Sequence, residues 1–90
     1  MLSFTFTSIF KKDHALMKNR SKDMGKLIEM ISLLVNEQSL MQKYEIHPLY
    51  GEHQGKWECH IEPNWLVIYH VDEAKRRVIF YRTGSHSDLF

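Results

Sequence analysis

The clearest periodic pattern in the sequence lies in residues 24–35. Apolar side chains recur there at the three- and four-residue spacing of one helix face, at Met24, Leu27, Ile28, Ile31, Leu34 and Val35. The opposite face carries polar or small residues such as Lys26, Glu29 and Ser32, and Ser21 or Asp23 can cap the amino end. An amphipathic helix is therefore predicted, and its apolar face must be buried against a second layer.

The residues before this helix predict a strand and a shorter helix. Leu2–Phe6 alternates apolar and polar side chains, which is typical of a strand. Thr7 or Ser8 can cap the helix that follows, which is expected to run for about three turns.

The second half predicts three strands, at residues 56–61, 65–71 and 76–83. Turn residues separate them at 62–64 and 72–75. Residues 37–55 are interpreted as a long loop, and the tail 84–90 as too short for an element of its own. The order β-α-α-β-β-β predicts an α+β fold, with two helices packed on one face of a small, largely antiparallel sheet.

Length and composition favour one domain spanning residues 1–90. The chain has 90 residues, 43% of them hydrophobic, which suffices for one core. The single cysteine, Cys59, excludes a disulfide scaffold and lies in an apolar pattern that predicts an inert, buried thiol. No 18-residue apolar run and no signal peptide are present, so a cytoplasmic protein without a membrane span is expected.

The charge pattern separates the two halves of the chain. The formal net charge is only +1, which argues against a strongly basic nucleic-acid binder. Residues 44–90 carry 5 basic and 7 acidic groups together with five of the six histidines. A histidine-rich, locally acidic half indicates specific chemistry more than general electrostatic attraction.

The face on which His60 lies depends on the length of the turn after it. A four-residue turn at 62–65 pairs Ile61 with Leu66 and His60 with Val67, and a three-residue turn directs His60 toward the helices instead. The four-residue turn is preferred because it buries one apolar set together: Trp57, Cys59, Ile61, Leu66, Ile68, Ile79 and Tyr81. It leaves a second set on the open face: Glu58, His60, Trp65 and Arg82.

An open sheet face with a histidine, an arginine and an aromatic ring suits phosphodiester chemistry, which needs proton transfer, charge stabilisation and a stacking surface. His47 in the loop and His86 in the tail can close over this face. The remaining histidines have simpler interpretations: His14 and His53 as surface residues, and His70 as a partly buried residue at a sheet edge.

The sequence motifs of zinc sites, serine hydrolases and nucleotide-binding loops are absent. His47, His53, His60 and His86 are spaced by 6, 7 and 26 residues, which matches no compact zinc motif, so no metal site is expected. The chain has no G-x-S-x-G elbow and no glycine-rich nucleotide loop.

Several segments of the second half resemble the YafQ branch of the RelE/ParE toxin superfamily. They are His47-Pro48-Leu49, Gly51, Gly55, residues 60–66, Ile68-Tyr69 and the tail 82–90 with its terminal Leu-Phe. The resemblance is strongest over residues 47–90, and the predicted order of elements extends it to the rest of the chain.

The resemblance implies a type II toxin, an endoribonuclease that cuts mRNA in the ribosomal A site and is held inactive by a DinJ- or RelB-like antitoxin. It implies metal-free attack of the 2′-hydroxyl on the adjacent phosphate, with no cofactor and a toxin that is monomeric alone. It places catalysis at His47, His60, His86, Arg82 and Phe90, with His86 as the acid and His60 or His47 as the base. RNA contact is expected at Asn64, Trp65, Lys56, Glu58, Arg76 and Arg77.

Two positions depart from the family pattern. Asn64 stands where the family usually has an aspartate, and Trp57 stands where it usually has an arginine. An amide can hydrogen-bond but cannot accept a proton at neutral pH, so Asn64 is expected to position a partner. The alternatives are a toxin-fold module that binds an antitoxin but cleaves poorly, and a gyrase-inhibiting relative.

Overall fold

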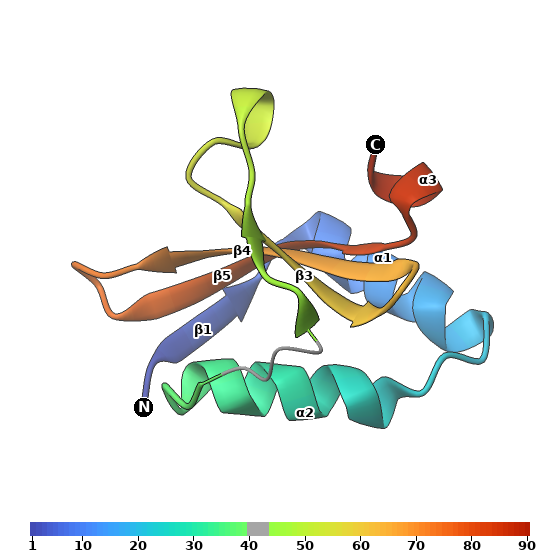
Figure 1. Cartoon of the computed structure of the whole chain (residues 1–90). Coiled ribbons are helices and arrows are strands. Elements are labelled where there is room, and N and C mark those ends of the chain that lie inside the picture. Colours follow the sequence, from blue (N-terminus) through green and yellow to red (C-terminus); the bar gives the residue numbers. More distant parts are fainter. Residues whose placement is uncertain (40–43) are drawn as a thin grey trace.

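The computed structural model describes residues 1–39 and 44–90. Its elements are β1 (Ser3–Phe6), α1 (Ser8–Asn19), α2 (Met24–Val35), β2 (His47–Pro48), the short 3-10 helix η2 (Gly51–His53), β3 (Trp57–Glu62), β4 (Trp65–Asp72), β5 (Arg77–Gly84) and α3 (His86–Leu89), as Figure 1 shows. None of the described helices is long and apolar enough to cross a membrane.

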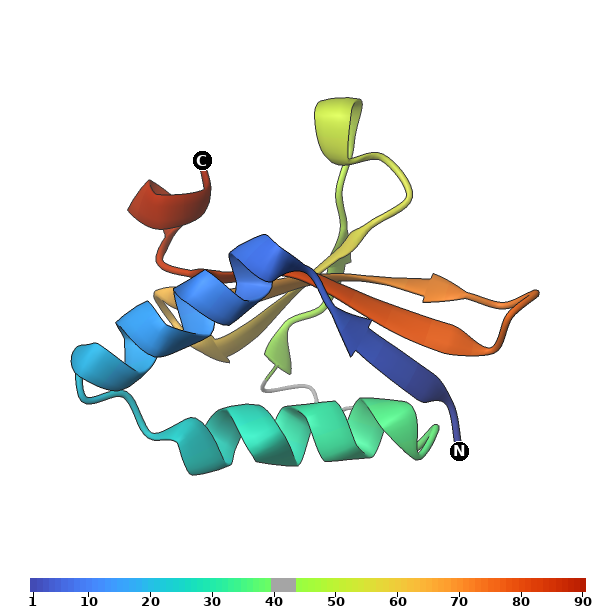
Figure 2. The same ribbon diagram turned by 180° about the vertical axis from the view of Figure 1, so that it is seen from behind.

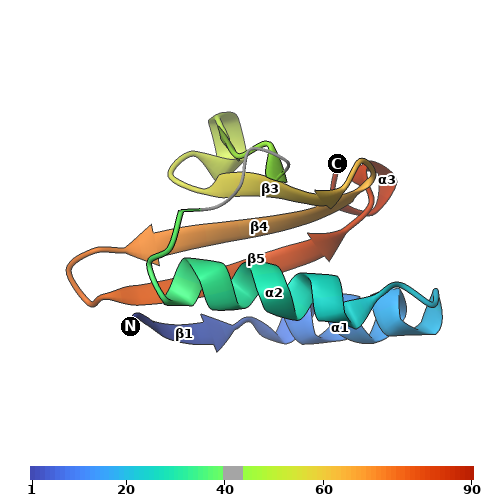
Figure 3. The same ribbon diagram turned by 60° about the horizontal axis from the view of Figure 1, so that its bottom comes forward.

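Five strands form one sheet in the order β1-β5-β4-β3-β2. β1 pairs in parallel with β5, and the other neighbours are antiparallel. α2 lies under one face, whereas η2 and α3 rise from the other (Figures 1 and 2). α1 continues from β1 along the β5 side of the sheet (Figure 3). The predicted α+β fold is confirmed.

The two long helices begin at predicted caps. Thr7 accepts a hydrogen bond from the backbone N–H of Phe10, and Asp23 accepts one from Gly25. Both helices contribute to one core with the helix-facing side of the sheet, and its buried members include Phe10, Met17, Leu27, Met30, Cys59, Trp65, Val67, Tyr69, Val78 and Phe80. The prediction of a buried Cys59 is confirmed, and burial raises the pKa of its thiol to about 12.

The predicted pairing of β3 with β4 is wrong by one residue. The turn contains only Pro63 and Asn64, with Glu62 paired to Trp65 and an irregularity between His60 and Glu62. His60 therefore pairs with Leu66 rather than Val67. The slip exchanges the faces of β4, so that Trp65 is buried in the core instead of lying on the open face.

An irregularity between β4 and β5 changes the faces of the last strand. Ile68 pairs with Arg82 but Tyr69 pairs with Phe80, which leaves Tyr81 as an extra residue. Val78 and Phe80 therefore fill the core, where Ile79 and Tyr81 were predicted. In this register Val71 pairs with Val78, and Arg82 pairs with Ile68. Trp57, also predicted to be buried, is 40% exposed.

Two segments predicted to lack structure contain short elements. Within residues 37–55 the edge strand β2 pairs His47 with Glu58 and Pro48 with Trp57, and η2 follows it. The part of that predicted loop at 40–43 lies outside the described residues. The tail forms α3, which begins with a reciprocal capping box between Ser85 and Asp88. Elements of two to four residues have no periodicity to detect.

Candidate active site

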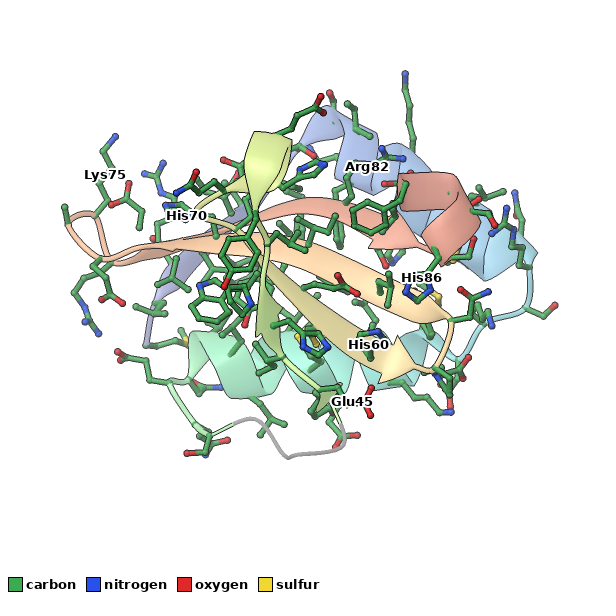
Figure 4. All side chains as sticks on the ribbon, turned by 45° about the horizontal axis from the view of Figure 1, so that its top comes forward. Glu45, His60, His70, Lys75, Arg82 and His86 are labelled. Carbon is green, nitrogen blue, oxygen red and sulfur yellow. The ribbon has the colours of Figure 1, made fainter. Side chains whose placement is uncertain are left out.

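Three titratable side chains meet on the sheet face opposite α2. His60 Nε2 lies 3.3 Å and His86 Nε2 lies 3.9 Å from the same oxygen, Oε1 of Glu58. Figure 4 shows His60 on its strand with His86 above it at the start of α3. Glu58 and His60 come from β3 and His86 from α3, so residues nearly thirty positions apart converge. His86 thus lies over the sheet face that carries His60, which is the arrangement that the sequence predicted.

A backbone carbonyl fixes the ring of His60. Its Nδ1 lies 3.3 Å from the carbonyl oxygen of Glu45, which can only accept a hydrogen bond. Nδ1 therefore carries a hydrogen, and Nε2, which faces the carboxylate of Glu58, donates a hydrogen bond to it only when the ring is the imidazolium. The side chain of Glu45 lies at the same ring, with Oε2 4.0 Å from Nδ1. Glu45 is a contact that the sequence analysis missed, because no pattern marks a backbone carbonyl.

The ring of His86 is fixed in a similar way by Asn64. The side-chain oxygen of Asn64 lies 3.0 Å from both the backbone N and the ring Nδ1 of His86. His86 is also the first residue of α3, whose capping box is held by Asp88. Asp88 in turn accepts two hydrogen bonds from Arg20.

Gly84 provides the space for this arrangement. A Cβ atom on Gly84 would come within 2.9 Å of both Cβ and Oδ2 of Asp88. Asp88 could then keep its place in the capping box with Ser85 only if α3 shifted. The glycine in the tail therefore serves packing beside His86.

His47 completes the histidine group from the sheet edge. It lies opposite Glu58 in the pairing of β2 with β3. Its ring stands edge-on to that of His60, with 5.5 Å between centroids, and the rings of His60 and His86 are 5.8 Å apart. The structure thus brings together the three histidines that the sequence predicted, with Glu58 between them.

Arg82 lies on the same face but is held by a carboxylate that the sequence analysis did not single out for this role. Asp13 of α1 accepts hydrogen bonds from Nε and Nη2 of Arg82 and from the backbone N–H of Thr83. The hydrogen bond to Asp13 raises the pKa of Arg82, so the side chain stays cationic. It is one third exposed, so a ligand can reach it.

Trp65 connects to this network from the core side. Its indole N–H donates to Thr83 Oγ1 at 2.9 Å, and the Thr83 hydroxyl donates to the carbonyl of Leu66. The indole is fully buried, so it has no free surface on which a base could stack. The structure places Trp65 as a support beneath the site.

The other predicted residues fall into two groups. Phe90 is 61% exposed and meets the ring of His53 edge-on, and Lys56 lies over the ring of Tyr81. Arg76 and Arg77 belong to the β4–β5 hairpin, and Lys75 of that hairpin lies at the opposite end of the sheet from His60 and His86 (Figure 4). Arg76 is paired there with Glu37. The structure does not bring this hairpin to the histidine group.

The same three side chains that face one another could also hold a metal ion. One ligand atom from each of Glu58, His60 and His86 lies within 4.8 Å of the others. Histidines whose Nδ1 atoms are hydrogen-bonded and whose Nε2 atoms face one point are typical of metal ligands. Imidazole donors suit zinc, copper, iron and nickel, and zinc sites also use carboxylate ligands.

The chain matches the family model described as a bacterial toxin of a type II toxin-antitoxin system, YafQ, over residues 2–90. It belongs to the YafQ family. The mRNA interferase toxin YafQ of Escherichia coli K12 is 38% identical over 86 residues, which cover 94% of this chain and 91% of the relative. The resemblance found in the tail and the loop is confirmed over almost the whole chain.

Solved structures of YafQ proteins share this fold. The E. coli DinJ-YafQ complex contains a chain with a TM-score of 0.91 and 35% identity, covering 100% of this chain and 99% of that one. A metal-bound toxin from Helicobacter pylori has a TM-score of 0.94 and 33% identity, with both chains covered completely. YafQ toxins have therefore been seen with an antitoxin, and a toxin of this fold has been seen with a metal.

Proposed function

We propose that this protein is the toxin of a type II toxin-antitoxin pair and acts as an mRNA interferase, cutting mRNA on the ribosome. One observation carries the proposal: two histidines present their Nε2 atoms to one carboxylate oxygen at 3.3 Å and 3.9 Å. Cleavage of RNA by its own 2′-hydroxyl needs one group to accept a proton and one to donate it. The YafQ relatives named as mRNA interferases support the same activity.

The proposed reaction needs no group beyond the side chains of the site. His60, or His47 beside it, accepts the proton of the 2′-hydroxyl as its oxygen attacks the adjacent phosphorus. His86 gives a proton to the departing 5′ oxygen, which leaves a cyclic phosphate and a free 5′-hydroxyl. Glu58 stabilises the imidazolium that forms, and Arg82 compensates the charge that develops on the phosphate oxygens.

The proposal extends to partners and location. A DinJ- or RelB-like antitoxin is the expected inhibitor, since an E. coli YafQ has been solved in complex with DinJ. The substrate is mRNA in the A site of a translating ribosome, and the place of action is the cytoplasm. Three further residues are proposed to act near the reacting bond. Phe90 and Lys56 contact the RNA, and Asn64 positions His86.

A second candidate function is metal binding at Glu58, His60 and His86. Two observations favour it: the ligand atoms already face one another, and a toxin of the same fold is described as metal-bound. An ion held there would occupy the Nε2 lone pairs that the cleavage reaction needs. In this chain a bound zinc or copper ion would therefore oppose cleavage.

The test is a reconstituted translation reaction in which mRNA ends are mapped. New ends within the A-site codon are expected with the wild-type protein and not with His86→Ala, whereas His14→Ala serves as a matched control away from the site. Absence of new ends with the wild-type protein, while translation continues, would overturn the nuclease. A parallel DNA supercoiling assay identifies gyrase inhibition, which would also count against it.

A further inference from the structure

A pocket opens on the sheet face that carries Arg82, beside the histidine group. It has a volume of about 270 Å³ and is lined by Thr7, Ile9, His53, Lys56, Ile68, Tyr81 and Arg82. This volume is slightly below the range of about 300–1,000 Å³ for sites of drug-sized ligands, so it suits a single nucleotide unit. From the sequence, His53 is predicted as a surface residue and Tyr81 as part of the core.

Two cations face this pocket. The Nζ atom of Lys56 lies 4.3 Å from the ring centroid of Tyr81 and makes no ion pair within the described residues. Arg82 uses Nε and Nη2 for Asp13, which leaves Nη1 without a hydrogen bond in the same part of the chain. Asp13 compensates one of the two charges, so the pocket keeps a net positive charge that favours an anion.

His53 adds a polar atom that lacks a partner. Its Nδ1 is buried and is the one buried side-chain nitrogen or oxygen in residues 1–39 and 44–90 that has no hydrogen bond. Buried polar atoms are nearly always hydrogen-bonded in native proteins, so such an exception calls for an explanation. His53 also lines the pocket, so a ligand there could supply the missing partner if the ring turned to bring Nδ1 to the pocket side. The ring is placed by Phe90, with 6.0 Å between centroids.

Strand pairing connects the pocket to the reacting groups. Glu58 pairs with Ile68, and Ile68 pairs with Arg82, so these three side chains form one row across β3, β4 and β5. Adjacent strands lie about 4.8 Å apart, so the row spans about 10 Å. Glu58 belongs to the histidine group, and Ile68 and Arg82 line the pocket. An RNA strand at the histidines would therefore continue into the pocket.

We propose that this pocket is a nucleotide subsite that binds the RNA unit next to the cleaved bond. The phosphate of this unit lies at Lys56, with Arg82 between it and the phosphate of the cleaved bond, and the sugar or base lies against the exposed side chain of Ile9. His53 completes the polar contacts. The identification of the ligand as RNA rests on the proposed function, because the pocket itself shows only anion chemistry beside apolar surface.

The experiment uses a labelled hexanucleotide with 2′-O-methyl groups, which binds but cannot be cleaved because the attacking hydroxyl is blocked. Affinity is measured by fluorescence anisotropy at several salt concentrations. Loss of one phosphate contact lowers the dependence of log affinity on log salt by about one. Lys56→Gln is expected to show this loss. Lys75→Gln, in the distant hairpin, is the charge-matched control and is expected to match the wild type.

His53→Gln is a second variant, and it leaves the charge of the neutral side chain unchanged. It is expected to weaken binding of the hexanucleotide without altering the salt dependence of the affinity. Amide NMR signals of Tyr81 and His53 should shift with the hexanucleotide more than with inorganic phosphate alone. Equal salt dependence in Lys56→Gln and Lys75→Gln would overturn the subsite. If the wild type still cuts mRNA in that case, the proposed function stands. If the wild type does not cut mRNA but Lys56→Gln binds the hexanucleotide more weakly than the wild type, the proposed subsite is supported and the proposed nuclease activity is contradicted.

Discussion

The side-chain oxygen of Asn64 lies 3.0 Å from two nitrogens of His86, the backbone N and the ring Nδ1. The backbone N–H must donate, so this oxygen is an acceptor and Nδ1 carries the ring hydrogen of neutral His86. Nε2 is then the atom available for proton transfer, and it faces Glu58. Asn64 can do this as an amide, although the family pattern usually has an aspartate at this position.

Asn64→Ala is expected to release the ring of His86 and lower the cleavage rate about tenfold or more, less than the factor of about 10²–10⁴ expected for His86→Ala. Nitrogen chemical shifts of the imidazole report which ring nitrogen is protonated. They should show a mixture of tautomers in the alanine variant. Asn64→Asp keeps the acceptor and should stay close to the wild type in tautomer. An unchanged tautomer and rate in Asn64→Ala would contradict the positioning role.

Trp65→Phe tests whether the indole supports the site or touches RNA. The phenyl ring keeps much of the buried volume but cannot donate to Thr83, so a loss of about 1 kcal/mol in unfolding free energy is expected. Trp65→Ala should cost about 3–5 kcal/mol. Urea unfolding measures both. Affinity for the uncleavable hexanucleotide should change little in Trp65→Phe, and a large drop in a folded variant would restore the sequence prediction of RNA contact.

Local patterns predict part of this structure well. The helix at Met24–Val35 follows from its spacing, and the positions of His47, His60 and His86 around one site follow from the resemblance. The register between neighbouring strands cannot be predicted in this way. Shifting a hairpin by one residue leaves the local sequence pattern equally good, but it moves every side chain of the strand to the other face of the sheet. That is why Trp65 and Tyr81 were placed on the wrong sides.

Contacts between segments far apart in the sequence also could not be predicted. Asp13 looks in the sequence like one charged position on a helix face, and only the tertiary fold brings it to Arg82 and Thr83. Glu45 acts on His60 through its backbone carbonyl, which every residue possesses. Such partners carry no residue-type signal.

Asp13→Ala is expected to destabilise the fold and impair cleavage together. It leaves the N–H of Thr83 without its partner and frees the guanidinium of Arg82, at a cost of about 1–3 kcal/mol. Asp13→Asn keeps an acceptor and should cost less while still reducing the rate at saturating substrate, because Arg82 is less firmly oriented. Chemical denaturation and cleavage kinetics measure the two effects. An Asp13→Asn variant with wild-type kinetics would show that Asp13 has a structural role alone.

Added zinc or copper is expected to inhibit cleavage by binding Glu58, His60 and His86. The ion would occupy the lone pairs that otherwise move protons, and a chelator selective for zinc or copper should restore activity at constant magnesium. Glu58→Gln removes the anionic ligand and should weaken metal affinity, which calorimetry on the isolated protein measures without any cleavage assay. Metal that stimulates cleavage, or binds Glu58→Gln as tightly as wild type, would contradict this assignment.

The carboxylate of Asp88 should make the tail sensitive to acid. Its hydrogen bond with Arg20, assisted by the backbone of Ser85, holds the pKa of Asp88 well below its usual value. A lowered pKa in the folded state stabilises α3 fully above the unfolded value of about 3.9, and the effect is lost as pH falls below it. The protection factors of the amides at 86–90, which correct for the pH dependence of intrinsic exchange, should therefore fall as the pH is lowered from about 4 to about 2. Arg20→Gln should move this loss to higher pH, and an unchanged midpoint would contradict the role of Arg20.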